Sequence, residues 1–239
     1  MVRGRIEDHF GEGNINVHTN CPLFRSLAKN DLYYSEFVNR GLVRTARRGD
    51  YEGIAWDIYH RLLNFIHLEP SLQRKYDNIT KDWTNRFVIG MQIRVGLGNG
   101  AFIDNCKFLF MSDLLTFEHY ANFYTNRTLL KPLWFISTDS AEVEGILYDK
   151  YPDRVLFLSE LPMKHTKELA YRKFEPAVQR AILDNYLLSR SNLLITTSWS
   201  SFGEMALGRM EKGKHIAITR SDPIVDPPPI HEFNRFGGE

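Results

Sequence analysis

The chain has 239 residues, of which 43% are hydrophobic and 25% charged, with a formal net charge of +1. This composition is typical of a protein with a buried core, and the balanced charge gives no electrostatic reason to expect nucleic acid or an anionic membrane as a partner. Two cysteines, Cys21 and Cys106, exclude a cysteine cluster around a metal and allow at most one disulfide. We expect both thiols to be unpaired.

The N-terminal region, residues 1–82, is predicted to be small and mainly helical. Its first ten residues lack the apolar segment of a signal peptide, and no apolar run in the chain reaches the roughly 18 residues that span a bilayer. Apolar residues recur at helical spacing over residues 54–66. Pro70 is expected to end this helix, and Ser71 is a candidate cap for a second one.

Strands and helices alternate over residues 83–222. Apolar runs predict buried strands at residues 87–93, 133–137, 155–158, 193–195 and 216–218. Amphipathic segments between them predict helices at residues 112–124, 139–148, 176–187 and 201–210. The alternation predicts an α/β fold, with a Rossmann-like parallel sheet and helices on both faces. The proline-rich tail, residues 223–239, is predicted to be extended or disordered.

Two of these helices begin with the residue spacing of a capping box, a short polar residue followed three positions later by glutamate. Asp139 precedes Glu142 in one helix, and Ser201 precedes Glu204 in the other. We therefore predict Asp139 and Ser201 as the N-caps of these helices.

An arginine follows the first predicted strand, at the strand end where ligands of such sheets bind. Arg94 is succeeded by a glycine-rich segment, residues 95–100. The planar guanidinium binds two phosphate oxygens at once and stays charged at any working pH, and glycines let the backbone approach a ligand closely. Arg94 is therefore a candidate diphosphate ligand; the alternative is a structural salt bridge at the sheet edge.

The end of the fourth strand is rich in hydroxyl groups. Thr197, Ser198, Ser200 and Ser201 lie between this strand and the next helix. The N-terminus of a helix attracts anions through its unpaired N–H groups and the helix dipole. Capping explains only Ser201, so this segment is a second candidate for binding phosphate.

Two further positions suit a ribose or a base. Thr138 and Asp139 follow the second strand, where they are able either to bind a ligand or simply to cap the next helix. Asp184, on the helix before the fourth strand, is able to pair with a base edge or to be a solvated helix position. Because parallel strands end at the same edge of a sheet, we expect the residues that follow them to lie close together.

Three peptides carry a resemblance to a known family: residues 88–94, 134–140, and 181–189 continuing into 197–203. They resemble the GDP-fucose-binding half of the α1,2-, α1,6- and protein O-fucosyltransferase superfamily. Gln92-x-Arg94, together with Ser-Trp-Ser-Ser-Phe-Gly, is most similar to the xyloglucan-type branch. The resemblance covers about residues 60–220. It implies the C-terminal, GDP-sugar-binding half of a GT-B fold, over residues 83–222, with a reduced, mainly helical acceptor-side part before it.

The resemblance also implies a function and a set of site residues. The implied GDP-fucose ligands are Gly90, Gln92, Arg94, Thr138, Asp139, Asp184, Ser198, Ser200, Ser201 and Phe202. Arg94 would contact the β-phosphate, Ser200 and Ser201 the diphosphate, and Asp184, with Asp139 more loosely, guanine or ribose. The implied reaction is an inverting transfer of fucose to a glycan or glycoconjugate, without metal or cofactor. The family's location is the Golgi lumen, if an anchor precedes this chain.

The chain departs from the family in two respects. Gln92 stands where the family usually has histidine, and no general base is identifiable beyond the candidate Asp104. Only 85 residues precede the first strand, fewer than the roughly 100 of an ordinary domain. A truncated or degenerate, non-catalytic GDP-sugar-binding module is therefore an alternative function.

A second alternative is an NAD(P)-dependent oxidoreductase. Residues 96–101 fit the pattern G-x-G-x-x-A after a strand, and Glu118 lies near the expected acidic position. Residues 102–110, however, do not open a helix cleanly, and Arg94 precedes the motif. These departures favour the nucleotide-sugar interpretation.

Overall fold

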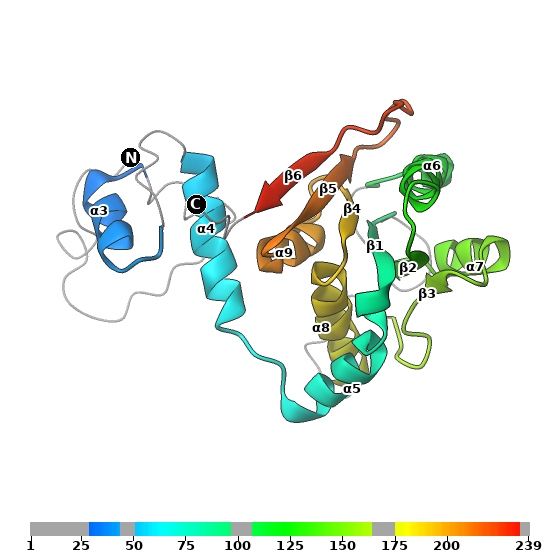
Figure 1. The fold of residues 1–239 in the computed structure, drawn as a ribbon, viewed down its shortest axis with the longest axis horizontal. Coiled ribbons are helices and arrows are strands. Elements are labelled where there is room, and N and C mark those ends of the chain that lie inside the picture. Colours follow the sequence, from blue (N-terminus) through cyan, green and yellow to red (C-terminus); the bar gives the residue numbers. More distant parts are fainter. Residues whose placement is uncertain (1–28, 44–50, 97–106, 164–174, 235–239) are drawn as a thin grey trace. The chain divides into compact units, whose positions relative to one another are not determined.

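The computed structural model of the chain describes residues 29–43, 51–96, 107–163 and 175–234 (Figure 1). The chain divides into two compact units, Met1–His67 and Leu68–Glu239. The sequence predicted a boundary after residue 82, whereas the helix before that position belongs with the second unit. None of the helices in the described ranges is long and apolar enough to cross a membrane.

The first unit contains two described helices, α3 (Asp31–Asn39) and α4 (Tyr51–Asn64). The side chain of Asn30 caps α3 by accepting a hydrogen bond from the amide of Leu32 at 3.1 Å. Val43 and Ile58 are buried together in this unit. Because α4 already ends at Asn64, the prediction that Pro70 ends this helix is wrong.

The second unit begins with α5 (Pro70–Thr80), followed by the short 3-10 helix η1 (Trp83–Asn85). Pro70 opens α5, where its missing N–H is harmless. Glu69 is the N-cap, and its carboxylate accepts a hydrogen bond from the amide of Ser71 at 3.0 Å. The predicted cap, Ser71, is therefore already inside the helix.

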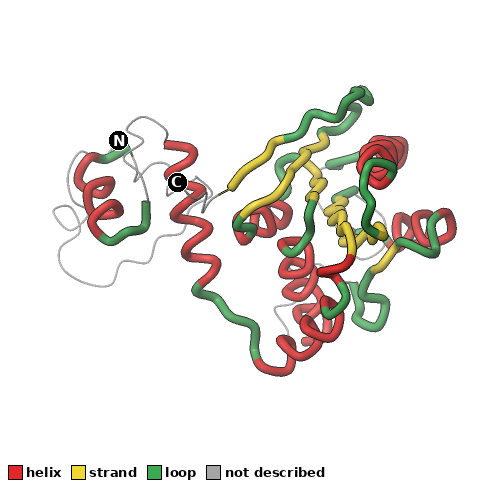
Figure 2. The backbone as a smooth tube through the Cα atoms, in the orientation of Figure 1, coloured by secondary structure: helices red, strands yellow, loops and turns green. Residues whose placement is uncertain are grey.

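A six-stranded sheet forms the centre of the second unit (Figure 2). Its strands are β1 (Arg86–Ile93), β2 (Lys131–Thr138), β3 (Val155–Leu156), β4 (Leu193–Thr197), β5 (Lys212–Ile218) and β6 (His231–Asn234). Their order is β3-β2-β1-β4-β5-β6, and all neighbours pair in parallel except β5 and β6. The prediction of an α/β fold with a parallel sheet is confirmed.

Helices cover both faces of the sheet (Figure 1). One face packs on α6 (Leu114–Thr125), which follows the 3-10 helix η2 (Met111–Asp113), and on α7 (Ala141–Lys150). The other face packs on α5, α8 (Glu175–Ser189) and α9 (Ser201–Arg209). Successive residues of a strand point to opposite faces. Ile89 and Met91 therefore join the α6 and α7 layer, whereas Val88 joins the α8 layer.

The tail contributes a strand that the sequence did not predict. Within it, β6 pairs antiparallel with β5, and Lys214 forms a 2.8 Å ion pair with Glu232 across the two strands. The ring of Phe233 packs against the core on the α8 side. A strand of four residues is too short to show a hydrophobic periodicity in the sequence. It forms because the edge of β5 offers unpaired backbone groups for hydrogen bonding.

Gly90 is expected to be required for packing, because it lies where β1 meets α8. A Cβ atom built there would lie 2.9 Å from Ser191 Oγ and 3.2 Å from Leu188 Cδ2. We predict that Gly90→Ala lowers the free energy of unfolding by about 1–3 kcal/mol, measured by urea denaturation. The control is Gly145→Ala in α7, where a Cβ would meet no described atom within 4 Å. This variant should be neutral or more stable by up to about 1 kcal/mol; equal losses in both variants would contradict the packing argument.

Candidate functional site

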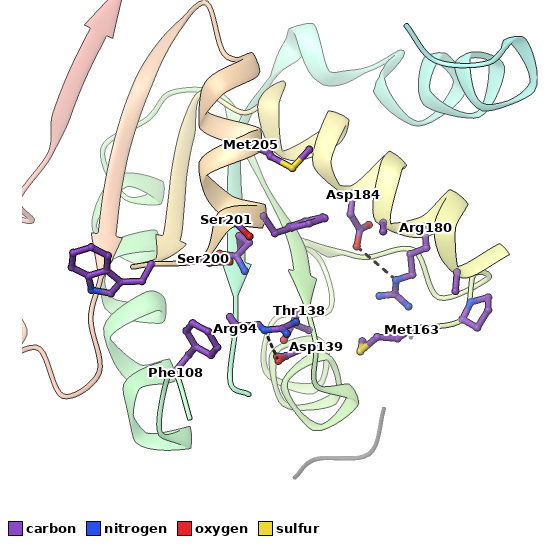
Figure 3. A pocket seen from close by; sticks show the side chains of 16 residues that line it. Arg94, Phe108, Thr138, Asp139, Met163, Arg180, Asp184, Ser200, Ser201 and Met205 are labelled. Atoms are coloured by element: carbon purple, nitrogen blue, oxygen red, sulfur yellow. Dashed lines mark ion pairs between the residues drawn. The ribbon is translucent and has the colours of Figure 1, made fainter. Parts of the chain in front are cut away.

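A pocket of about 490 Å³ lies at the carboxyl edge of β1, β2 and β4, between these strand ends and helices α8 and α9 (Figure 3). Its position is the point where the sheet order reverses, because the chain adds β2 and β3 on one side of β1 and β4 on the other. The predicted site residues that line it are Gln92, Arg94, Thr138, Asp139, Asp184, Ser200, Ser201 and Phe202. The strand ends therefore converge as the sequence predicted.

Arg94 is held at the pocket by the ends of the two strands beside β1. Its amide donates to Thr197 Oγ1 at 2.8 Å, and its Nε lies 3.3 Å from Asp139 Oδ2. The alternative role of Arg94, a structural salt bridge, is thus present, and the same side chain also lines the pocket. Its side chain is 20% exposed, so it is oriented by the protein yet reachable by a ligand.

Asp139 organises the backbone that follows β1. Its Oδ1 accepts from the amide of Val95 at 2.8 Å and its Oδ2 from the amide of Gly96 at 2.9 Å. Gly96 has a φ of 69°, a left-handed conformation that glycine adopts without strain. The carboxylate therefore fixes a sharp turn after the strand and orients Arg94 at the same time.

Both predicted N-caps are wrong by one position. The N-cap of α7 is Ser140, whose side chain accepts from the amide of Val143 at 3.4 Å, and Asp139 binds the β1 turn instead. The N-cap of α9 is Ser200, not Ser201. The side chain of Ser200 forms no capping hydrogen bond within the described chain. The side chains of Ser200 and Ser201 line the pocket at the N-terminus of α9. A helix N-terminus with hydroxyl groups is suited to bind an anion.

Asp184 is a buried carboxylate on the wall that α8 contributes. Its Oδ2 accepts from Ser137 Oγ at 2.9 Å and lies 3.7 Å from Arg180 Nε. Its Oδ1 is also buried, and it has no hydrogen-bond partner among the described residues. Burial raises the pKa of Asp184 to about 7, although the charge of Arg180 and the bond from Ser137 oppose this shift. The second alternative for Asp184, a solvated helix position, is excluded by this burial.

Arg180 is a pocket residue that the sequence did not suggest. It is buried, donates to the carbonyl oxygen of Leu161 at 2.9 Å, and forms an ion pair with Glu144. Burial raises the pKa of Glu144, and the charge of Arg180 lowers it. Arg180 precedes Asp184 by four residues, so helical spacing was the signal that placed both on one face of α8 (Figure 3).

Gln92 supplies a second buried acceptor at the pocket. Its side chain is 3% exposed, and its Oε1 has no hydrogen-bond partner within the described part of the chain. A Cβ added at Gly203 would lie 2.8 Å from this oxygen, so the first turn of α9 passes directly over the amide group. A buried acceptor without a donor costs about 1–3 kcal/mol, and a ligand donor would remove that cost.

Two implied ligands do not line this pocket. Gly90 packs against α8, and Ser198 lines a neighbouring cavity, where its hydroxyl bonds to Thr219 Oγ1 at 3.1 Å. The candidate base Asp104 and both cysteines, Cys21 and Cys106, lie outside the described residues.

The pocket also contains apolar residues that the sequence analysis did not single out: Phe108, Pro162, Met163, Ala177, Ala181, Trp199 and Met205. Pro162 and Met163 lie in the segment after β3. Candidate residues were taken from the segments after the first, second and fourth strands, and the same search after β3 would have included this segment. Within the described ranges, no three His, Cys, Asp or Glu side chains gather where they would hold a metal ion.

No protein-family model matches the chain, and no curated protein matches its sequence. Its structure is similar to solved fucosyltransferases. A mutant of Arabidopsis thaliana FUT1, in complex with GDP, matches with a TM-score of 0.50 and 15% identity, over 84% of this chain and 43% of that one. Fucosyltransferase NodZ from Bradyrhizobium matches with a TM-score of 0.46 and 18% identity, over 77% of this chain and 52% of that one. NodZ α-1,6-fucosyltransferase co-crystallized with GDP matches with a TM-score of 0.45 and 15% identity, over 85% of this chain and 63% of that one.

The chain therefore spans between 43% and 63% of the length of these structures. Its mostly parallel six-stranded sheet, with helices on both faces, corresponds to part of their GT-B fold. In its fold, this chain is structurally similar to the GDP-fucose-dependent fucosyltransferases that its sequence motifs resemble.

Proposed function

We propose that the pocket is the GDP-fucose site of an inverting, metal-independent fucosyltransferase that acts on a glycan or glycoconjugate. The observation that carries this proposal is the convergence of a guanidinium, a hydroxyl-rich helix start and two unpaired buried acceptors on one pocket. Its volume of about 490 Å³ is within the usual range for small-molecule sites, about 300–1,000 Å³.

The diphosphate is assigned to the end of the pocket formed by β1, β4 and α9. Arg94 donates to phosphate oxygens through its guanidinium, and Asp139 holds that group in place. Ser200 and Ser201 stand at the positive end of the α9 dipole. Together they provide cationic and neutral donors, which is the combination that a doubly charged diphosphate requires.

The guanosine is assigned to the wall formed by α8. Asp184 Oδ1 and Gln92 Oε1 are acceptors without partners in the described structure, so the matching ligand groups are donors. The guanine edge carries N–H donors at N1 and N2, and ribose carries two hydroxyls. Uracil has a single N–H donor on its pairing edge, and adenine presents an acceptor at N1. The pair of acceptors therefore favours guanosine.

The reaction would proceed by direct displacement at the anomeric carbon of fucose. An acceptor hydroxyl forms the new C–O bond on one face while the bond to the β-phosphate oxygen breaks on the other, and a base takes the hydroxyl proton. Arg94 and the α9 amides would stabilise the negative charge that develops on the leaving diphosphate. Asp104 stays our candidate for the base.

The non-catalytic module remains the second candidate, because the chain spans only part of the similar structures. The oxidoreductase alternative is not favoured. Glu118, its expected ribose ligand, lies on α6, where it forms an ion pair with Lys150 and accepts from the hydroxyl of Tyr151 at 2.9 Å. This carboxylate joins α6 to α7 and does not line the pocket.

Thermal unfolding with a nucleotide panel tests the proposal. GDP and GDP-fucose are expected to stabilise the protein by about 2.7 kcal/mol at a concentration one hundred times Kd, which raises the Tm by several degrees. ADP, UDP, NAD and NADP should raise it much less. Stabilisation by NAD with none by GDP would refute the assignment. Stabilisation by GDP without fucose transfer to any glycan in an acceptor panel would support the non-catalytic module instead.

A further inference from the structure

Trp199 has two unfavourable properties at once. Its φ is 64°, in the left-handed region. This backbone conformation costs about 1–2 kcal/mol for most residues; glycine, and occasionally asparagine or aspartate, adopt it readily. Trp199 is also 84% exposed, although large aromatic rings normally stabilise a protein by burial. Glycine would avoid both costs at this position. Strain of this kind is typically retained at functional sites.

The indole borders two cavities. It lines the pocket described above, and it also lines a second cavity of about 270 Å³. The residues of this second cavity are Lys107, Phe108, Ser198, Trp199, Thr219 and Arg220. Because Phe108 and Trp199 belong to both linings, the second cavity adjoins the proposed donor site.

The second cavity has the groups that bind a sugar ring. The C–H groups on one face of a pyranose are slightly positive and pack on the electron-rich face of an indole. Ser198 and Thr219 place two hydroxyls 3.1 Å apart at the same cavity. These hydroxyls are able to donate to, or accept from, ring substituents.

Two cationic side chains, those of Lys107 and Arg220, line this cavity. Their cationic groups lie 4.8 Å and 5.3 Å from the ring centroid of Phe110. The neighbouring carboxylates are engaged with the main chain: Asp113 accepts from the amides of Phe110 and Ser221, and Asp222 accepts from the amide of Thr219. The described lining contains two cations and no carboxylate, which favours an anionic substituent on the ligand.

We propose that this second cavity is an acceptor subsite, in which a pyranose ring stacks on Trp199 and a carboxylate on that ring meets Arg220 and Lys107. The acceptor would then be a glycan that contains uronic acid. The assignment as an acceptor site rests on the proposed donor site, whereas binding of the acidic glycan does not.

The test is the binding of trigalacturonate and of its methyl ester to the full chain, without any nucleotide. The two ligands differ in charge but share their rings, and calorimetry or quenching of tryptophan fluorescence gives the affinity. Trigalacturonate is expected to bind about tenfold more tightly than the ester, as for a hydrogen bond to a charged group. Equal affinities, or no binding of either, would overturn the proposal.

Two variants examine the residues. Trp199→Gly should abolish the fluorescence response and weaken binding at least about tenfold, while the Tm stays the same or rises because backbone strain is released. A Tm several degrees lower would indicate a structural role for the ring and would overturn the argument from strain. Three other tryptophans provide the background: Trp83 and Trp134 are buried, and Trp56 is half-buried on α4 and lines neither cavity.

Arg220→Ala should remove the preference for the acid over its ester. Arg220 donates to the carbonyl oxygen of Lys107 at 3.2 Å and lies over the ring of Phe110. The control is Arg127→Ala, because Arg127 makes the same two kinds of contact, with Phe123, but lines neither cavity. GDP binding, measured separately, reports on the donor site. If GDP fails to bind but trigalacturonate binds as described, the donor assignment is wrong and the glycan site stands.

Discussion

Replacing Arg94 with alanine is expected to reduce fucose transfer from GDP-fucose by about a hundredfold to a thousandfold. The loss follows because an oriented donor at a leaving diphosphate acts on charge that develops in the transition state. Arg94→Lys keeps the charge but loses the planar fork, so its activity should be intermediate. Steady-state kinetics with labelled GDP-fucose provides the measurement, and the decrease should appear in kcat as well as in kcat/KM.

The control is Arg154→Ala. Arg154 is half-buried, with its guanidinium 5.4 Å from the ring centroid of Trp134, and it does not line the pocket. Loss of Arg154 should change stability but leave kcat close to that of the natural chain. If folded Arg94→Ala kept more than about half of the activity, Arg94 would not contact the leaving group. Asp139→Asn provides a further comparison, because the amide weakens the ion pair that orients Arg94.

Affinity for GDP-fucose is expected to rise about tenfold between pH 6 and pH 8. Burial raises the pKa of Asp184 to about 7, so the ionised form increases from about a tenth to about nine tenths of the molecules over this range. In the ionised carboxylate Oδ1 carries no proton and is able to accept an N–H donor of guanine. The apparent affinity follows the fraction of this competent form. GDP-fucose is the suitable ligand, because its diphosphate has no proton that titrates between these pH values.

Asp184→Asn separates this explanation from other titrating groups. The variant should bind GDP-fucose more weakly than the natural chain, by at least about tenfold at pH 8. Its affinity for GDP-fucose should not change between pH 6 and pH 8. The stability of the free protein should change in the opposite direction. The unfolded chain has a pKa near 3.9 for this group, so the folded state holds the extra proton between about pH 4 and pH 7. The free energy of unfolding therefore falls as the pH rises through that window.

Asparagine does not titrate, so Asp184→Asn removes this pH dependence of the free energy of unfolding. The variant should therefore have a higher Tm than the natural chain at pH 8 and nearly the same Tm at pH 5. Weaker ligand binding combined with greater stability is the signature of a group retained for function. Should Asp184→Asn lose stability at every pH, or should the natural chain bind GDP-fucose equally at pH 6 and 8, Asp184 would be a structural carboxylate.

The central strands were predictable because each is a short apolar run between polar turns. β1 and β4 are buried on both faces, so nearly every residue carries the signal. β5 was predicted only in its second half, because Lys212, Lys214 and their neighbours are partly exposed near the edge of the sheet. β6 was missed, since its pairing is decided by the free edge of β5 and not by its own four residues.

For the site, local chemistry predicted which residues gather and tertiary packing decided what each one does. Arg94 and Ser200 were recognisable because each follows a strand, and parallel strands end at the same edge of the sheet. The role of Asp139 was not recognisable, because a helix cap and a clamp on the neighbouring strand use the same residue type. Only the packed structure distinguishes them.

The amino-acid sequence by itself determined the alternation of strand and helix, the α/β class and the polar composition of the strand ends. These depend on short-range periodicity and on the side chains themselves. The tertiary structure decided the burial of Asp184 and Arg180, the left-handed turn at Trp199 and the second cavity that its indole borders. These depend on residues far apart in the chain. Burial changes a carboxyl pKa only once other elements have displaced its water.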